Sequence, residues 1–304
     1  MKYLFLALLA LLILMAGCSE GPAPAAPADD PAGLLQVRTT CFPVDWLVQR
    51  IGGDRIDRVN ILPVGEDPPF WQPSGEVIAA LGDADLIVVN GAGFERWTLT
   101  AALPVSKVVD ASNGLDLIHF EGSTHSHGVR GEHSHSGTDP HTWSDPRTYL
   151  AQARNVRDAL VEADPSNGEY YDENLASVQE DLEELHREYS RVLAPARGLH
   201  LAANHPAYGY LARRYNLEIR SFDFDPDATP SAEQLQGFST WAPDGGRLIL
   251  FWESEPSPEV VQAFPDRVRH VYLDPLEQPA EGGYDYLAQA RANLAILEGL
   301  LQKN

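Results

Sequence analysis

Cysteine, basic residues and long apolar runs are all scarce in this 304-residue chain. Its two cysteines, Cys18 and Cys41, are too few for a disulfide scaffold or a cysteine-cluster zinc fold. Lys and Arg number 22 against 44 Asp and Glu, and the formal net charge of −22 repels phosphate backbones, so we expect no nucleic-acid partner. The longest apolar run spans only residues 3–15, whereas a membrane-spanning helix needs roughly 20 residues. HExxH and GxSxG motifs are also missing, which disfavours the commonest zinc protease and serine hydrolase classes.

The apolar run has the length of a signal-peptide core and follows a basic residue, Lys2. It ends in Leu14-Met15-Ala16-Gly17-Cys18, which resembles the lipobox of bacterial lipoproteins, where the cysteine is acylated and becomes the mature N-terminus. We therefore predict a signal peptide over 1–17 and a lipid anchor on Cys18. The protein is then extracytoplasmic and membrane-anchored, in the periplasm or at the cell surface. An ordinary signal peptide with an incidental cysteine is the alternative.

The body of the chain predicts an α/β fold. Residues 18–33 are rich in Pro, Ala and acids and predict a flexible tether, after which strand-like and helix-like segments alternate. This alternation is typical of parallel sheets. An apolar stripe predicts one long helix from about 167 to 193, formed by Leu175, Val178, Leu182, Leu185, Tyr189 and Val192. We expect two α/β lobes, 34–165 and 198–304, joined by a rigid connecting helix within 166–197.

Four of the ten histidines lie in a Gly/Ser/His segment, residues 123–137: His125, His127, His133 and His135. Such a composition cannot build a packed core. The segment predicts a mobile surface loop that binds metal as an auxiliary site. The alternative is a low-complexity insertion without function.

Three further residues stand in better-defined settings. His141 follows the His-rich segment in Asp-Pro-His-Thr-Trp, while His205 and Asp274 each end a predicted strand and are each followed by proline. Ligands of open α/β sheets bind at the carboxyl ends of strands. Two imidazoles and a carboxylate suit Zn²⁺, and also Mn²⁺ or Fe²⁺.

Several motifs, in this order along the chain, resemble those of the metal-binding subunits of ABC transporters for zinc and manganese, the cluster A-I solute-binding proteins. The stretches that carry the resemblance are spread along nearly the whole mature chain: Thr39–Pro43, Leu62–Ser74 (LPVGEDPPFWQPS), Ala84–Trp97 (ADLIVVNGAGFERW), Asp139–Pro146 (DPHTWSDP), His205–Tyr215 (HPAYGYLARRY), Pro226–Gln234 and Leu273–Pro275.

The resemblance implies a metal site between two lobes that are joined by a long helix. It places the family's second and third ligands at His141 and His205, and its late carboxylate at Asp274. A histidine at position 205 favours zinc. The first family histidine is missing, because Pro69 stands where the family pattern Asp-Pro-His has its histidine.

The resemblance further implies capture of Zn²⁺ and its delivery to an ABC permease with its ATPase, by a monomer that is not an enzyme. A Mn²⁺- or Fe²⁺-binding homologue remains an alternative. So does a scaffold or adhesin that has lost metal binding through Pro69. A metal-dependent hydrolase is the third alternative, because three protein ligands with an open position is the pattern of catalytic zinc, but no general base stands beside the triad.

Overall fold

The computed structural model describes residues 33–119, 124–126, 132–134, 137–242 and 247–302. The chain divides into two units, residues 1–33 and Leu34–Asn304, and the fold below is that of the second unit. Within the described residues, no helix is both long and apolar enough to cross a membrane. The predicted signal peptide over 1–17, the anchor Cys18 and nearly all of the tether lie outside the described residues.

A first parallel sheet forms the N-terminal part of this unit, with strand order β2-β1-β3-β4. Every residue of β3 is buried, as its continuous apolar sequence predicts for a strand covered on both faces. The crossover helix α2 begins where Ser74 Oγ accepts the Val77 N–H. The elements are β1 (Leu35–Thr39), α1 (Phe42–Gly52), β2 (Ile56–Asn60), α2 (Gly75–Leu81), β3 (Leu86–Val89) and β4 (Val108–Asp110).

A second parallel sheet follows, with strand order β10-β9-β7-β8. Its central strand β9 is fully buried. A capping box between Ser231 and Gln234 starts α6, and Ser257 caps α7. The elements are β7 (His200–Ala203), α5 (Gly209–Tyr215), β8 (Ile219–Ser221), α6 (Ala232–Trp241), β9 (Leu248–Trp252), α7 (Pro258–Gln262) and β10 (Val268–Tyr272). The predicted α/β class with parallel sheets is confirmed.

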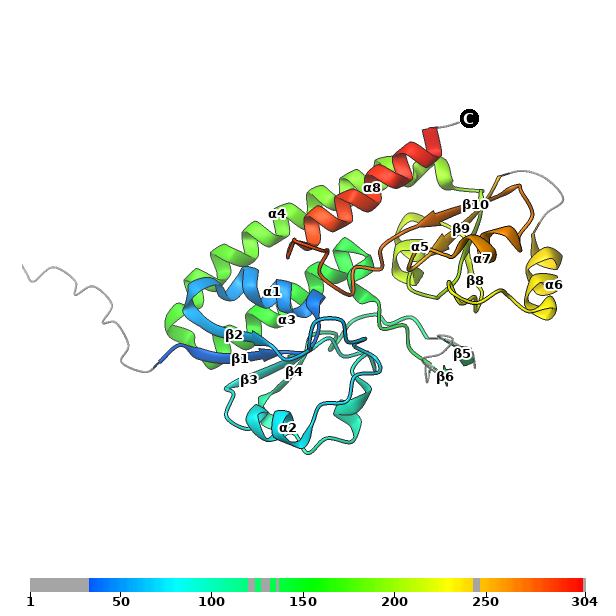
Figure 1. Ribbon diagram of the computed structural model, residues 1–304. Coiled ribbons are helices and arrows are strands. Elements are labelled where there is room, and N and C mark those ends of the chain that lie inside the picture. Colours follow the sequence, from blue (N-terminus) through cyan, green and yellow to red (C-terminus); the bar gives the residue numbers. More distant parts are fainter. Residues whose placement is uncertain (1–32, 120–123, 127–131, 135–136, 243–246, 303–304) are drawn as a thin grey trace, which may run out of the picture. The chain divides into compact units, whose positions relative to one another are not determined.

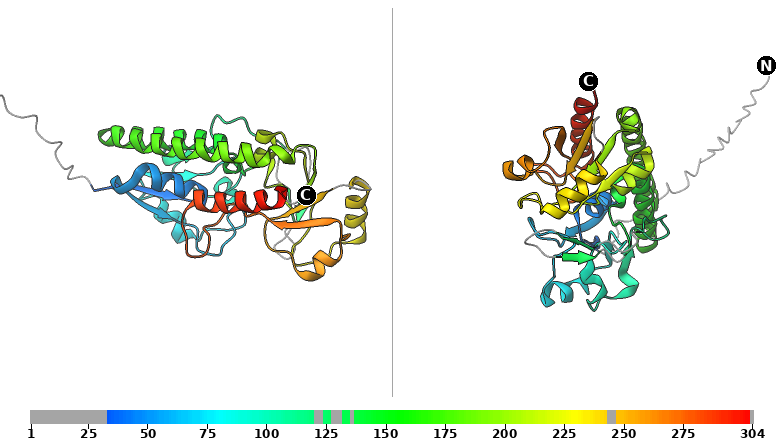
Figure 2. Two further views of the ribbon diagram at one scale, coloured as in Figure 1. Left: turned by 90° about the horizontal axis from the view of Figure 1, so that it is seen from above. Right: turned by 90° about the vertical axis from the view of Figure 1, so that its right-hand side faces the viewer.

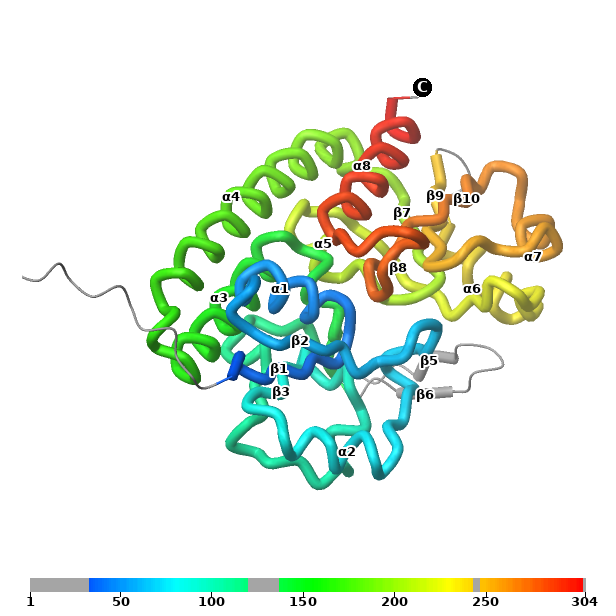
Figure 3. Tube along the Cα trace, turned by 60° about the vertical axis from the view of Figure 1, so that its left-hand side comes forward, coloured from blue at the N-terminus to red at the C-terminus, as the bar shows by residue number. Residues whose placement is uncertain are grey.

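Three longer helices accompany the sheets: α3 (Pro146–Ala163), α4 (Gly168–Leu193) and α8 (Tyr286–Gln302). The long helix predicted from the apolar stripe is α4, and all six stripe residues are buried. Helix α3 runs beside α4, and both contact α1 (Figure 3). Farther along, α4 packs against the C-terminal helix α8, as two views show (Figures 1 and 2).

The largest apolar cluster is continuous through both sheets. It contains Val37 and Val88 of the first sheet, the α4 stripe, and Leu201 and Ile249 of the second. A separate aromatic cluster lies between α6, α7 and the second sheet, and a smaller one lies beneath α2. Both sheets therefore share one core along α4, instead of each having only its own.

The His-rich segment contains a short antiparallel pair, β5 (Thr124–Ser126) with β6 (Glu132–Ser134), where the sequence predicts only a loop. In this pair, the backbones of His125 and His133 are directly opposite each other. Strand pairing satisfies backbone groups that a bare loop leaves to water, and the low apolar content does not reveal it. His127 and His135 lie outside the described residues.

Candidate metal site

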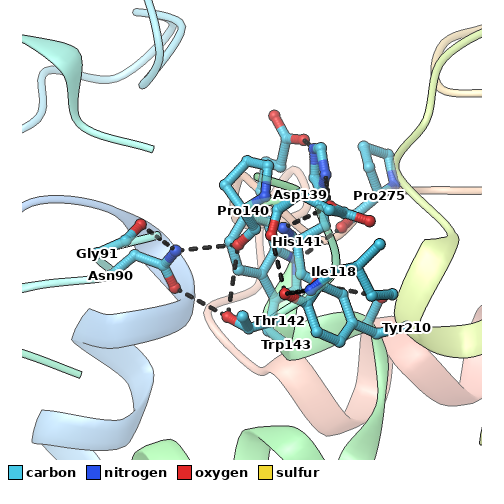
Figure 4. A network of polar contacts seen from close by, with 12 residues as sticks. Asn90, Gly91, Ile118, Asp139, Pro140, His141, Thr142, Trp143, Tyr210 and Pro275 are labelled. Atoms are coloured by element: carbon cyan, nitrogen blue, oxygen red, sulfur yellow. Dashed lines mark hydrogen bonds and ion pairs between the residues drawn. The ribbon is translucent and has the colours of Figure 1, made fainter. Parts of the chain in front are cut away.

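His141 lies on a segment fastened to the end of the first sheet. Asn90, directly after β3, donates from Nδ2 to the Pro140 carbonyl at 3.0 Å and accepts from the Thr142 hydroxyl at 3.3 Å (Figure 4). After a single 3₁₀ turn (Thr142–Ser144), Asp145 caps α3 by accepting the N–H groups of Arg147 and Thr148. The imidazole is thus carried between a strand end and a helix start.

Two carboxylates hold the His141 ring, one at each nitrogen. Nδ1 lies 2.7 Å from Asp139 Oδ1, and Nε2 lies 3.0 Å from Glu277 Oε1. The residue is only 2% exposed. Burial alone would lower the pKa of His141, but the hydrogen bonds and negative charges of Asp139 and Glu277 outweigh it and raise the pKa to about 10. The ring is therefore paired with a carboxylate at each nitrogen.

His205 lies next to His141, although the two are 64 residues apart in the numbering (205 − 141). It follows β7 and is 6% exposed, and the two ring centroids are 5.5 Å apart. Two imidazoles on one tetrahedral zinc, with bonds of about 2.0–2.1 Å, have ring centres about 5 Å apart. The distance between the two ring centres is therefore close to that of two histidines that bind one metal ion.

Asp274 lies beyond the end of β10, and its carboxylate shapes a turn. Oδ1 accepts the Leu276 N–H at 2.8 Å, and Oδ2 accepts from Gln289 Nε2 at 3.0 Å. Leu276 adopts a φ of +63°, a conformation that costs energy for a residue other than glycine. This turn presents Glu277, three residues after Asp274, to His141. The structure thus places a different carboxylate against the histidine from the one that the sequence indicates.

Further hydrogen bonds tie the turn to the His141 segment. Trp143 donates from Nε1 to the Pro275 carbonyl at 2.9 Å, and the Tyr286 hydroxyl donates to the Trp143 carbonyl at 2.6 Å. Gln278 Nε2 donates to the Glu66 carbonyl at 2.7 Å, so the loop that carries Pro69 contacts the segment that carries Glu277.

The comparison with known families agrees with this geometry. The sequence profile of the family described as "Zinc-uptake complex component A periplasmic" matches residues 37–299, which is well over half of the chain. The chain belongs to this family. The resemblance to metal-binding subunits of ABC transporters is thereby confirmed.

Individual relatives of this zinc-uptake family are moderately similar. The high-affinity zinc uptake system protein ZnuA of Bacillus subtilis is 29% identical over 310 residues, which cover 97% of this chain and 96% of ZnuA. The zinc-binding lipoprotein AdcA of Streptococcus pneumoniae is 27% identical over 280 residues, and the match covers 88% of this chain but only 56% of AdcA. The crystal structure of the metal-dependent lipoprotein YcdH from Bacillus subtilis superposes with a TM-score of 0.74 at 28% identity, covering 87% of this chain and 98% of that one.

The structure brings together only part of the ligand set expected for a zinc-uptake component. His141 and His205 are adjacent, Asp274 is engaged in its turn, and Pro69 is half-buried on the loop between β2 and α2. Among the described residues, no group of three or more His, Cys, Asp or Glu side chains is already arranged to hold a metal ion.

Two residues of the site were not identified from the sequence. Asp139 stands two positions before His141, and an Asp-x-His spacing is a signal for a carboxylate that orients an imidazole. Glu277 follows β10 in the segment Leu273-Asp274-Pro275-Leu276-Glu277, which also contains Asp274, the carboxylate that the sequence indicates. The turn at Leu276, with its positive φ and its hydrogen bond to Asp274, places Glu277 against His141.

Proposed function

We propose that this chain is the extracytoplasmic metal-binding subunit of an ABC importer. In this role it captures Zn²⁺ and delivers it to a permease that an ATPase drives. The proposal rests on membership of the zinc-uptake family together with the site geometry. The relatives that are named for zinc uptake or zinc binding support zinc as the cargo.

The observation that carries the proposal is the buried contact between His141 Nε2 and Glu277 Oε1, with the His205 ring beside it. Asp139 accepts the Nδ1 proton, which leaves Nε2 as the nitrogen for metal. Two imidazoles and one carboxylate are ligands that zinc commonly takes. We therefore propose His141, His205 and Glu277 as ligands, with Asp274 holding the turn that presents Glu277.

Pro69 leaves the fourth coordination position to a water molecule or to a histidine from the segment 123–137. Water suits a three-ligand zinc site. A histidine from that segment would strengthen binding, at the entropic cost of ordering the segment. A three-ligand site exchanges metal more readily, which suits a protein that must release its cargo.

The alternatives make different predictions for metal titration. A Mn²⁺- or Fe²⁺-binding homologue would bind that metal more tightly than zinc, whereas a scaffold that has lost its site through Pro69 would bind neither. A hydrolase would also bind zinc, and a turnover assay would distinguish it. The permease, the ATPase and the monomeric state are parts of the proposal that follow from the family.

Calorimetric titration of four proteins with Zn²⁺ and Mn²⁺ tests the site. We expect His205→Ala to lose tight zinc binding. We expect Glu277→Gln to weaken it by about 100-fold or more, because a neutral amide is a poor zinc ligand. Asp274→Asn is the matched control, since its amide oxygen still accepts the Leu276 N–H, and we expect it to weaken binding by only about tenfold.

Zinc binding by His205→Ala as tight as that of the wild type would refute the site. A larger loss in Asp274→Asn than in Glu277→Gln would return the ligand role to Asp274. If the wild type binds Mn²⁺ more tightly than Zn²⁺, the cargo is Mn²⁺ and not Zn²⁺.

A further inference from the structure

The segment that follows His205 contacts both of the other ligand-bearing segments. Three consecutive residues make these contacts: Tyr208, Gly209 and Tyr210, at the start of α5. The Tyr208 hydroxyl donates to the Leu273 carbonyl, just before the turn that presents Glu277. Tyr208 is 4% exposed and Tyr210 is fully buried. The contacts therefore belong to the interior.

Tyr210 joins two backbone groups that lie far apart in the chain. Its hydroxyl donates to the Asp139 carbonyl at 2.9 Å and accepts the Ile118 N–H at 3.2 Å (Figure 4). The Asp139 N–H in turn donates to the Ile118 carbonyl at 2.8 Å. One phenol thus holds the backbone of Asp139 from the side of His205.

Gly209 lies directly against the Asp139 carboxylate. A Cβ at this position would lie 2.3 Å from Asp139 Oδ2 and 3.4 Å from Ile118 Cδ1. Asp139 Oδ2 is buried and makes no hydrogen bond in the structure, while Oδ1 accepts both the backbone N–H and the Nδ1 proton of His141. Any side chain at 209 would push the carboxylate that orients His141.

We propose that Tyr210 is a positioning residue for metal binding, and that Gly209 provides the space this role requires. The inference rests on the proposed function. Tyr210 places the Asp139 backbone, Asp139 orients the His141 ring through Nδ1, and His205 is carried five positions before Tyr210 on the same segment. The phenol therefore sets the position of one histidine ligand relative to the other.

The test uses Tyr210→Phe, with Tyr215→Phe as the matched control on the same helix. Tyr215 is also buried, and its hydroxyl lies 3.1 Å from His186 Nδ1, a contact that does not involve the site. Zn²⁺ affinity is measured by chelator competition, and site geometry by the visible absorption spectrum of the Co²⁺-loaded protein. Thermal unfolding of the metal-free proteins reports the general loss of stability.

We expect Tyr210→Phe to weaken zinc binding by about 3- to 10-fold, as the loss of one buried hydrogen bond implies, and to change the Co²⁺ spectrum. Gly209→Ala should weaken binding at least as much, and it decides the question alone if Tyr210→Phe does not fold. Tyr215→Phe should lower the unfolding temperature by a similar amount and leave affinity and spectrum unchanged.

If Tyr210→Phe has the zinc affinity and Co²⁺ spectrum of the wild type, the positioning role of Tyr210 is wrong, while the proposed function is unaffected. An equal loss in Tyr215→Phe would also overturn it, because the effect would then be one of general stability. If the wild type binds neither Zn²⁺ nor Co²⁺, the proposed function is wrong and so is this inference.

Discussion

Carboxylates face both ring nitrogens of His141, so we expect the metal-free protein to carry a proton on each of them at neutral pH. Burial would lower its pKa, but Asp139 and Glu277 raise it from 6.5 to about 10. Zinc must displace the Nε2 proton, so binding and proton release are coupled. The same shift stabilises the metal-free fold fully below about pH 6.5, and this contribution is lost as the pH rises through about 10.

We predict that zinc affinity rises about tenfold per pH unit between about pH 7 and 9, since one proton is released at His141. An ordinary histidine, with a pKa near 6.5, would give a level affinity above about pH 7. Chelator competition at several pH values measures the slope. Glu277→Gln offers a comparison, because it removes one of the two carboxylates that raise the pKa. A flat profile in the wild type would contradict this account of His141.

At the scale of elements, the segments that carry the proposed ligands are all irregular stretches between helices and strands. His141 precedes α3, His205 lies between β7 and α5, and Glu277 lies between β10 and α8. Each stretch is held by hydrogen bonds to another segment, so backbone rigidity comes from contacts instead of secondary structure. The β5–β6 pair differs from these stretches, because it forms a two-stranded sheet of its own and joins neither of the four-stranded sheets.

We predict that deleting residues 123–137 removes weak, rapidly exchanging metal equivalents and leaves one tight zinc site. The ligands proposed for the tight site, His141, His205 and Glu277, lie outside the deletion. Ordering the His-rich segment around a metal costs conformational entropy, which keeps its affinity low. Calorimetry with excess zinc counts the equivalents. Loss of the tight site on deletion would show that one of His125, His127, His133 or His135 is an obligatory ligand.

At the scale of the whole molecule, one apolar cluster connects both sheets through α4. The α4 stripe therefore contributes to the stability of both sheets. The formal charge of −22 and the two carboxylates that face His141 both favour the approach of a cation.

We predict that the protein is held at the membrane through Cys18. The apolar run before it and the sequence Ala16-Gly17-Cys18 motivate this expectation. A single acyl chain anchors weakly, so stable association requires the multiple chains of a lipoprotein N-terminus. Fractionation of cells that express Cys18→Ala should move the protein from the membrane to the soluble fraction. Membrane association that is unchanged in this variant would rule out the anchor.

Much of the fold followed from local patterns. The apolar stripe from Leu175 to Val192 identified α4, and continuous apolar runs such as Leu86–Val89 identified strands, because burial on one or both faces imposes a pattern that the chain displays. His141 and His205 were proposed as ligands because the Asp-Pro-His and His-Pro motifs lie at the ends of predicted elements, and the structure places the two rings side by side. The structure places Cys41 in the main core as a free thiol.

The sequence by itself thus determined the α/β class and the long helix, since these depend on neighbours a few positions away. It proposed the two histidines as ligands, which stays a prediction. Only the tertiary structure decided that Glu277 faces His141. This contact depends on the positive φ of Leu276 and on Gln289 of α8, which donates a hydrogen bond to the Asp274 carboxylate. The clamp of Tyr210 on Asp139 was equally beyond reach, since its partners lie 71 positions apart. Local periodicity carries no information about such pairs; packing of distant segments alone creates them.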